Sequence, residues 1–425
     1  MKRPATGTSL ARHCSICGIV IFAAGLLVGE ASAKTFNVRA FGARGDGRAL
    51  DTEPLQRALD ACSQAGGGVV VLPAGTYLSR PIFLRSRTTL RLDKGATLQA
   101  TDEPKDFRDP ASPGAVLALV NGKGLEDIAI TGPGKIDGAG ARWWEPVRAA
   151  KRAGTPEPQR RPRLVVLTGC KHVRISGITL ANSPSFHLVP VECEDVVIKR
   201  ITVHAPADSP NTDAIDPSAC RQVLITRCVL DVGDDNVALK SGHAVPGRTA
   251  ACEDITVTRC TFLHGHGMSI GSETLGGVRR LRVRHCTFQD TISGLRIKSA
   301  RGRGGLVEDV TYSDITMKDV KIPLNITAYY PKVPAADTAQ PVARDTPRYR
   351  HIRISNLSAT STSSAGLIVG LPEQPVEDLQ LENVHLSAPL GLALRNARGI
   401  TFKKVTVQVQ RGEPVRLENA EVKQD

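Results

Sequence analysis

Four stretches of the 425-residue chain repeat one pattern: CKHVRISGITL (170–180), CEDVVIKRITV (193–203), CRQVLITRCVL (220–230) and CEDITVTRCTF (252–262). Counted from each leading cysteine, hydrophobic residues recur at offsets +3, +5, +8 and +10. The first two of these positions are two residues apart, and so are the last two, which is the spacing of strands that bury one face. Every repeat is therefore predicted to hold two short strands separated by a turn.

The same spacing continues to the C-terminus. It restarts at Val278, Val307, Tyr349, Val376 and Ala397. Successive starts from Cys170 to Val278 lie 23, 27, 32 and 26 residues apart, and later ones 21 to 42 apart, so loops of different length are inserted. A unit of this kind cannot bury its hydrophobic row alone and must stack on its neighbour. We therefore predict an all-β fold, a single-stranded right-handed parallel β-helix.

Cysteine recurs at two positions of the repeat. One row comprises Cys170, Cys193, Cys220 and Cys252, and the other comprises Cys228, Cys260 and Cys286. We interpret both rows as small hydrophobic residues buried in stacked coils. Neighbouring coils of a solenoid are also close enough for disulfides, and the sequence leaves their pairing open.

The first 33 residues have the features of an export signal. A positive region with Lys2, Arg3 and Arg12 precedes a short apolar stretch (16–28), and the small residues 31–33 suit cleavage. We expect residues 1–33 to be removed and residues 34–425 to form a single domain that is periplasmic or secreted. Because no later stretch approaches about 18 apolar residues, we expect no membrane association after cleavage.

An amphipathic helix is predicted before the first coils. Within residues 52–64, the apolar residues Leu55, Ala58, Leu59 and Cys62 share one face, and Asp51 or Thr52 can cap the helix. The glycines at 66–68 are predicted to end it, since the Gly-Lys-Ser/Thr of a phosphate-binding loop does not follow. We expect this helix to cover the open N-terminal end of the solenoid.

Two further stretches, 142–163 and 331–348, are rich in proline and arginine and lack alternation. We predict long loops there, over the face on which binding residues lie.

The charge and the aromatic content restrict the partner. The chain carries 55 Lys and Arg against 42 Asp and Glu, a net charge of +13. This charge suits an anionic polysaccharide as well as a nucleic acid. Only 4% of the residues are aromatic, which is a poor supply for stacking bases. The charge does not choose between the two, and the low aromatic content favours an acidic polysaccharide and no nucleic acid as the partner.

A third alternating stretch follows the two strands of the repeat. It reads Phe186-His187-Leu188, Val237-Ala238-Leu239, Met268-Ser269-Ile270, Leu295-Arg296-Ile297 and Leu324-Asn325-Ile326, and we expect these five to superpose. Their outer residues should face the core and their middle residues should point outward. Polar segments adjoin or overlap these stretches: Asn211-Thr212-Asp213, Gly233-Asp234-Asp235, Gly265-His266-Gly267 and Arg296-Ile297-Lys298. On coils about 4.8 Å apart, they would share one external face.

Such a patch contains the groups that glycoside hydrolysis requires. One carboxylic acid protonates the leaving oxygen, and a carboxylate activates water. Mutual repulsion among three carboxylates is expected to raise the pKa of at least one of them, which keeps a proton available for the acid step. Arg296 and Lys298, two residues apart on a strand, would hold a sugar carboxylate. A single aspartate in a solenoid turn is as often structural as functional, so the coincidence on neighbouring coils carries the interpretation.

These four polar segments resemble the signature segments of glycoside hydrolase family 28, the polygalacturonases and their relatives. The third extends to GHGMSIGS (265–272), and GGGVVVLPAGTY (66–77) also resembles bacterial members. The resemblance implies a right-handed parallel β-helix that hydrolyses α-1,4-linked galacturonate with inversion and needs no metal or other cofactor. Ala214 departs from the glycine that usually follows the first aspartate.

The resemblance also implies roles for individual residues. Asp234 would be the general acid, Asp213 and Asp235 would position and activate the water, and His266 would tune the acid. The expected substrate-binding residues are Arg296, Lys298, Tyr330 and Asn211. Tyr329, next to Tyr330, stays open as the alternative tyrosine.

Two other functions are compatible with this fold. A pectate lyase-type enzyme would hold calcium with the aspartates, but the Gly-His-Gly segment and the order of the motifs argue against it. A non-catalytic polysaccharide-binding β-helix would not bring acids together with Arg and Lys. Endo or exo attack stays open, with loops 142–163 and 331–348 favouring exo attack slightly, and we expect a monomer.

Overall fold

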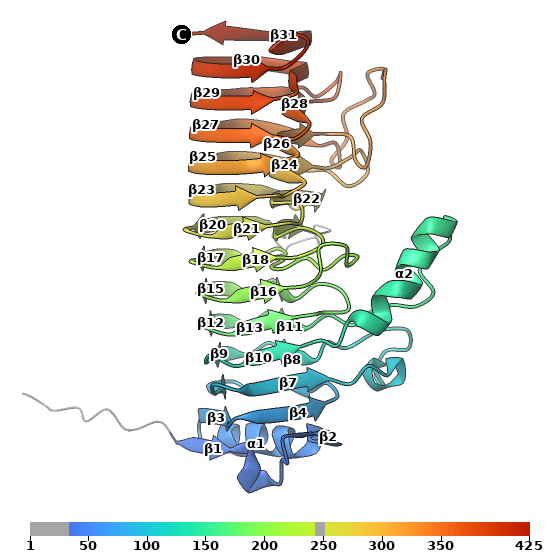
Figure 1. The fold of residues 1–425 in the computed structure, drawn as a ribbon, viewed down its shortest axis with the longest axis vertical. Helices are drawn as coiled ribbons and strands as arrows, with labels where there is room; N and C mark the ends of the chain where they lie inside the picture. Colours follow the sequence, from blue (N-terminus) through green and yellow to red (C-terminus); the bar gives the residue numbers. More distant parts are fainter. Residues whose placement is uncertain (1–33, 243–250) are drawn as a thin grey trace, which may run out of the picture. The chain divides into compact units, whose positions relative to one another are not determined.

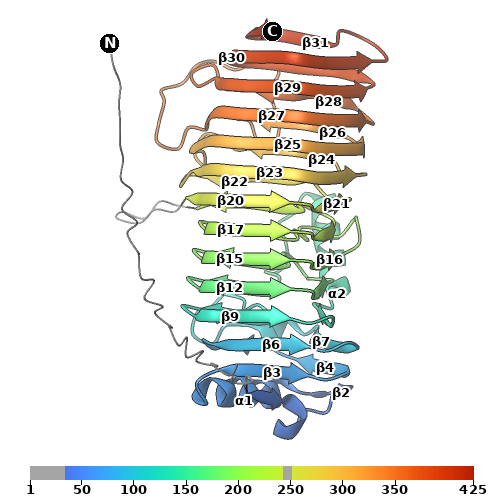
Figure 2. The same cartoon turned by 90° about the vertical axis from the view of Figure 1, so that its left-hand side faces the viewer.

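The computed structural model describes residues 34–242 and 251–425, and the expected export signal lies outside the described residues. Lys34–Asp425 forms one compact unit. In this unit the strands stack as coils of a right-handed parallel β-helix, which confirms the predicted fold class (Figure 1, Figure 2). One continuous hydrophobic core runs along the inside of the coils. No helix in the described ranges combines the length and the hydrophobicity needed to cross a membrane.

Three columns of parallel strands build the coils. The first column contains β1 (Thr35–Asn37), β3 (Gly68–Leu72), β6 (Thr88–Leu92), β9 (Glu126–Thr131), β12 (Lys171–Ser176), β15 (Glu194–Lys199), β17 (Arg221–Thr226) and β20 (Cys252–Thr258). The second contains β2 (Asp46–Leu50), β4 (Gly75–Ser79), β7 (Ala96–Ala100), β10 (Lys135–Asp137), β13 (Thr179–Ala181), β16 (Thr202–His204), β18 (Val229–Asp231) and β21 (Thr261–Leu263). Single long strands then run through both columns: β23 (Val278–Gln289), β25 (Leu306–Val320), β27 (Arg348–Ser361) and β29 (Val376–Ala388).

The third column carries the polar segments. It contains β5 (Ile82–Phe83), β8 (Val120–Lys123), β11 (Val165–Thr168), β14 (Leu188–Val191), β19 (Val237–Ser241), β22 (Met268–Thr274), β24 (Ser293–Lys298), β26 (Ile322–Thr327) and β28 (Ser364–Val369). The last strands also begin in this column: β30 (Leu390–Val409) continues through the first and second columns, and β31 (Val415–Gln424) continues into the first. Short 3₁₀ turns lie at Val38–Phe41 and Pro104–Phe107.

The predicted repeat starts lie opposite one another in the parallel ladder. Cys252 pairs with Val278, Val278 with Val307, and Val307 with Tyr349. Because these pairs are in register, the hydrophobic residues at the four repeat offsets stack inside the core. The alternation and the restart positions therefore predicted the coil register correctly.

A bend that the hydrophobic pattern does not reveal recurs at offset +7. Arg200, Arg227 and Arg259 occupy it in consecutive coils with φ of 53°, 55° and 55°. This left-handed conformation is unfavourable for a residue with a Cβ. The amides of Arg200 and Arg227 offset part of that cost by donating to the carbonyls of Thr226 and Thr258 in the next coil, at 3.0 and 3.1 Å. Stacking thus holds a backbone shape that a single coil would not.

The N-terminal helix α1 (Thr52–Gln64) has the predicted bounds and buries the predicted face against the first strands. The predicted cap is wrong. The Asp51 carboxylate accepts the amides of Arg44 and Gly45 at 2.7 and 2.9 Å, and Thr52 Oγ1 accepts the Arg80 amide at 2.8 Å. These side chains fasten the start of the helix to neighbouring loops and are not available to cap it.

Part of the predicted loop at 142–163 is a helix. Helix α2 (Ala141–Ala153) buries Trp143, Trp144, Val147 and Ala150, and it projects beside the coils in Figure 1. The prediction gave too much weight to proline and arginine content and overlooked the helical spacing of these apolar residues. Their burial outweighs the amide that Pro146 removes from the helix. Residues 154–163 and 331–347 are irregular, as expected.

The predicted superposition of the third stretches is right for four coils and wrong for the first. Val237, Met268, Leu295 and Leu324 are in register. Leu188, however, lies opposite Ile215, and Ile215 lies opposite Val237. The third-column segment of the coil that starts at Cys193, residues 215–218, therefore separates them, and the stretch 186–188 is displaced by two residues. Residues 215–218 form only isolated bridges and include a proline, which concealed this segment in the sequence.

All eight cysteines of the described residues are buried and free. In the row that begins at Cys170, the thiol of Cys193 donates to the carbonyl of Leu167 in the neighbouring coil at 3.3 Å. Both cysteine rows thus serve as small interior side chains, as interpreted from the sequence.

Candidate active site

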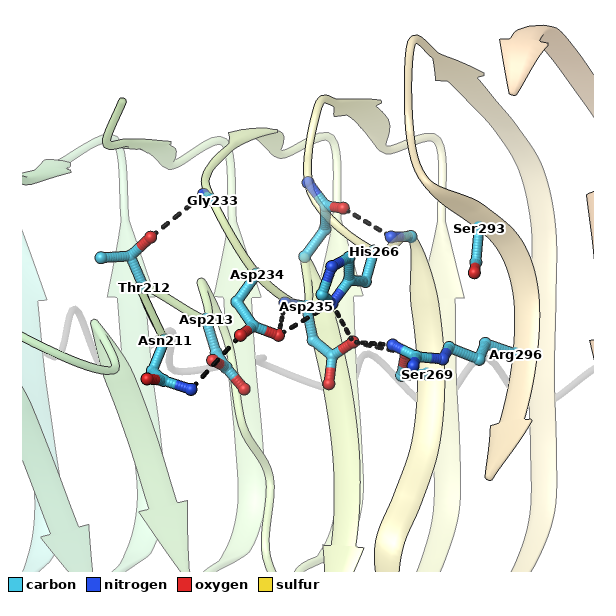
Figure 3. A network of polar contacts seen from close by, with 12 residues as sticks. Asn211, Thr212, Asp213, Gly233, Asp234, Asp235, His266, Ser269, Ser293 and Arg296 are labelled. Atoms are coloured by element: carbon cyan, nitrogen blue, oxygen red, sulfur yellow. Dashed lines mark hydrogen bonds and ion pairs between the residues drawn. The ribbon is translucent and has the colours of Figure 1, made fainter. Parts of the chain in front are cut away.

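The four predicted polar segments come together on one face of the third column (Figure 3). Three of them are turns that lead into this column, and β24 supplies the fourth. The amide of Ala214 donates to the carbonyl of Asp235 at 2.9 Å, so Asp213 and Asp235 lie at the same level of adjacent coils. Figure 3 shows the carboxylates of Asp213, Asp234 and Asp235 side by side.

Asp235 lies at the centre of the site and is 2% exposed. Its Oδ2 accepts from Lys298 Nζ at 2.7 Å, and its Oδ1 accepts from Ser269 Oγ at 2.7 Å and from Arg296 Nη1 at 3.3 Å. Burial alone would raise the pKa of Asp235, but the charges of Lys298 and Arg296 outweigh it and hold this pKa well below its usual range. Asp235 is therefore ionised, with donors on both oxygens.

Asp234 is less buried and faces His266. His266 Nδ1 lies 2.9 Å from Asp234 Oδ1 but is not aligned for a hydrogen bond. On the other oxygen, Asn211 Nδ2 donates at 3.4 Å. Burial opposes ionisation, but His266 and the charge of Lys298 outweigh it, and the pKa of Asp234 is lowered. Without substrate this carboxyl is therefore ionised.

Asp213 has a different environment, which the sequence analysis missed. Lys240 Nζ contacts Asp213 Oδ2 at 3.1 Å and also forms an ion pair with Asp216. Burial, followed by repulsion from Asp216, raises the pKa of Asp213 well above its usual value. The sequence analysis expected repulsion to raise the pKa of the acid that donates the proton. Instead the pKa of Asp234 is lowered, and the raised values belong to Asp213 and Asp216, mainly because of burial. Lys240 follows the outward-facing Ala238 by two residues, a spacing that could have revealed it.

Tyr330 is the tyrosine that lies at the site. Its ring centre is 5.3 Å from Lys298 Nζ and 5.9 Å from Arg296 Cζ. Tyr329 instead donates its hydroxyl to Asp337 at 2.7 Å. The two tyrosine side chains thus lie in different surroundings. The structure therefore distinguishes Tyr330 from Tyr329, a choice that the sequence left open.

Arg161 joins the loop after α2 to the site, a contact that was not anticipated. Its guanidinium donates to Asn211 Oδ1 at 2.8 Å and to the carbonyls of Pro184 and Pro210 at 2.9 and 2.7 Å. A cavity of about 600 Å³ opens beside Asn211, lined among others by Phe186, Arg160, Arg161 and Arg163. The site therefore adjoins a hollow with arginines in its wall.

One group of residues in the described ranges has the compactness of a metal site. Ligand atoms of Asp234, Asp235 and His266 all lie within 4.8 Å of one another. However, Lys298 and Arg296 already contact Asp235, and their positive charges would repel a cation there. We assign no metal ligands to this group.

Comparison with known proteins identifies the family. Residues 62–409 match the family model described as glycosyl hydrolases family 28. The chain belongs to this family. As a member of family 28, it is a glycoside hydrolase.

Individual relatives of this family 28 protein agree. It is 33% identical over 373 residues to a probable polygalacturonase of Vitis vinifera, covering 82% of this chain and 74% of the relative. It is also 33% identical over 374 residues to an endo-polygalacturonase of Pectobacterium carotovorum, covering 83% and 87%. The solved exopolygalacturonase of Thermotoga maritima superposes with a TM-score of 0.71 at 26% identity, covering 91% of this chain and 92% of the other.

Proposed function

We propose that this family 28 protein is a polygalacturonase that hydrolyses α-1,4-galacturonosyl linkages with inversion. The observation that carries the proposal is the position of Arg296, Lys298 and Tyr330 directly beside Asp234 and Asp235. A neutral sugar would gain little from two largely buried cations, whereas a uronate carboxylate pairs with both. The names of the relatives support the same substrate.

The proposed reaction assigns one proton transfer to each side of the sugar. Asp234 gives its proton to the glycosidic oxygen, which leaves with the electron pair of the broken C–O bond. A water on the opposite face bonds to the anomeric carbon and passes its proton to Asp213 or Asp235. Attack from the face opposite the leaving group inverts the configuration, and none of these steps requires a metal.

Substrate binding is proposed to supply the proton that Asp234 needs. In the free protein, Lys298 is one of the charges that lower the pKa of Asp234. A bound uronate carboxylate would neutralise Lys298 and displace water, and both effects raise this pKa. The site would therefore take up a proton as the substrate enters.

The decisive experiment determines the masses of products formed from polygalacturonate in the presence of a chelator. Fragments one water heavier than internal units are expected, since hydrolysis adds water to each cleaved bond. Fragments without that water would identify a lyase, and no fragments would exclude this substrate. Fragment sizes would also separate release from chain ends, which α2 and loop 331–348 favour slightly, from random cutting.

The role of Asp234 is tested by Asp234→Asn. We expect turnover to fall by about 10²- to 10⁴-fold with polymer binding retained, because only the transferable proton is lost. Asp231→Asn is the matched control, since Asp231 contacts His204 and His264 outside the site. Unchanged turnover in Asp234→Asn would remove this residue from the acid role.

The remaining expectations are also part of the proposal. Residues 1–33 would direct export and be cleaved, and residues 34–425 would act as a single-domain monomer, periplasmic or secreted. The N-terminal sequence of the mature protein, cell fractionation and its mass in solution test these points. Finding the protein inside the cell with residues 1–33 still attached would contradict export.

A further inference from the structure

Asp213 and Asp235 differ in their capacity to accept a proton from water. Both oxygens of Asp235 are occupied by donors from Ser269, Arg296 and Lys298. Asp213 Oδ1, in contrast, has no hydrogen-bond partner within the described ranges. A carboxylate with a free oxygen is the better acceptor for the proton of a water molecule. The two candidates for the base are therefore not equivalent.

Asp213 is coupled to a buried pair that the reaction does not use directly. Lys240 Nζ lies 3.1 Å from Asp213 Oδ2, and the same ammonium contacts Asp216. Asp216 is 1% exposed, and its Oδ1 also lacks a described hydrogen-bond partner. The ring centre of Phe186 lies 4.3 Å from Lys240 Nζ and covers it from the side of the cavity. Two carboxylates thus share one shielded ammonium.

The remaining charges around this triad are few. The charges of Asp234 and Asp235 also act on Asp213. The charges of Asp235 and Arg163 act on Asp216, and the charge of Asp235 acts on Lys240. Lys240 is the cation in direct contact with Asp213, and Asp216 is the acid that competes for it. The proton affinity of Asp213 should therefore respond to both residues, in opposite directions.

We propose that Asp213 is the base that takes the proton of the attacking water, and that Lys240 and Asp216 are positioning residues that set its proton affinity. Lys240 favours the ionised form of Asp213 and holds its Oδ2, which leaves Oδ1 free for the water. Asp216 competes for the same ammonium and so raises the proton affinity of Asp213. The water loses a proton to Asp213 as its oxygen bonds to the anomeric carbon. The assignment of the base rests on the proposed hydrolysis, whereas the coupling of the three side chains does not.

Two variants test the coupling because they shift the same titration in opposite directions. Lys240→Met should raise the titration midpoint of Asp213 by about 1 to 3 pH units, and Asp216→Asn should lower it. The midpoint is measured by carbon NMR on protein labelled at the aspartate carboxyl carbon. The Asp213 signal is identified by its loss in Asp213→Asn.

The pH profile of kcat/KM on oligogalacturonate tests the catalytic assignment. Its acidic limb should move up in Lys240→Met and down in Asp216→Asn, because a base must be ionised to act. Lys240→Arg should keep the limb near its original position. Lys94→Met, a change at an exposed lysine, is the charge-matched control.

The outcomes separate this inference from the proposed function. Midpoints of Asp213 that stay unchanged, or that shift in the same direction in both variants, would overturn the coupling. Shifted midpoints with an unshifted acidic limb would overturn Asp213 as the base. If polygalacturonate is not hydrolysed, the substrate proposal fails, and the NMR titration still decides the coupling. Should Lys240→Met not fold, Asp216→Asn decides alone, and a midpoint of Asp213 that does not fall in this variant would overturn the coupling.

Discussion

The two halves of the charged site each contain an aspartate that is almost completely buried, but the pKa values of these two aspartates are shifted in opposite directions. On the side toward the N-terminus, Asp213 is 3% exposed and shares the ammonium of Lys240 with Asp216. On the other side, Asp235 is 2% exposed and contacts both Arg296 and Lys298. The pKa rises for Asp213 and falls for Asp235. Because burial is equal, the signs of the neighbouring charges decide in which direction each pKa moves.

The largest expected effect comes from removing the negative charge of Asp235. Asp235→Asn leaves two largely buried cations without their carboxylate, so we expect the free energy of unfolding to fall by about 3–5 kcal/mol at pH 7. Chemical denaturation measures this loss. Asp290→Asn, at an exposed aspartate, should change stability by less than about 0.5 kcal/mol. Similar losses in both variants would show that the cations do not depend on Asp235.

The same carboxylate should make the protein sensitive to acid. The pKa of Asp235 is lower in the folded than in the unfolded state, so its contribution is present above about pH 4 and is lost as pH falls further. One such proton changes stability by about 1.4 kcal/mol per pH unit. Asp235→Asn should flatten the stability profile between pH 2 and 4 by that slope. An unchanged slope would assign the acid sensitivity to other groups.

On the other half of the site, the matching substitution should change the free energy of unfolding in the opposite direction. Asp213→Asn leaves Lys240 with Asp216 as a neutral pair, so we expect the free energy of unfolding to rise by about 1 kcal/mol at neutral pH. Because the folded pKa of Asp213 is raised, this gain should shrink as pH falls below the folded pKa and vanish near the unfolded pKa of about 4. Activity should be lost at the same time. A destabilised Asp213→Asn would contradict the comparison.

The smallest effect is expected in the uncharged interior. Cys260 stacks between Cys228 and Cys286, and Cys260→Ala removes one buried sulfur atom. We expect a loss of about 0.5–1 kcal/mol in thermal or denaturant unfolding, with no change in the pH profile. Because no charge is involved, an altered acid sensitivity in this variant would show that the interior rows and the charged face are coupled.

The coil architecture could be predicted because its signal is local. Alternation by two residues gives the buried face of each strand, and the spacing between restarts gives the pairing, as Cys252 opposite Val278 illustrates. Helix α1 followed from apolar spacing alone. The convergence of the segments containing Asp213, Asp234 and His266 then followed from stacking, since strands at the same repeat position share one face.

The errors arose where that signal was weak. Ile215 forms only isolated bridges, so the third-column segment of its coil was missed and Phe186 was placed two residues out of register. Helix α2 was obscured by Pro146 and its arginines, although Trp143 and Val147 have helical spacing. In both cases burial by neighbouring coils, which composition does not reveal, stabilised the element.

By itself the sequence determined the β-helix, its register and the face on which the acids gather, because these depend on residue periodicity along the chain. Only the tertiary structure decided which acid binds its proton more tightly and which tyrosine faces the site. Those properties depend on where long side chains end: Lys240 reaches Asp213 from 27 residues away in sequence, and Tyr330 rather than Tyr329 turns toward Lys298. Electrostatic interactions weaken with the distance between charges, so only the folded arrangement of charges sets them.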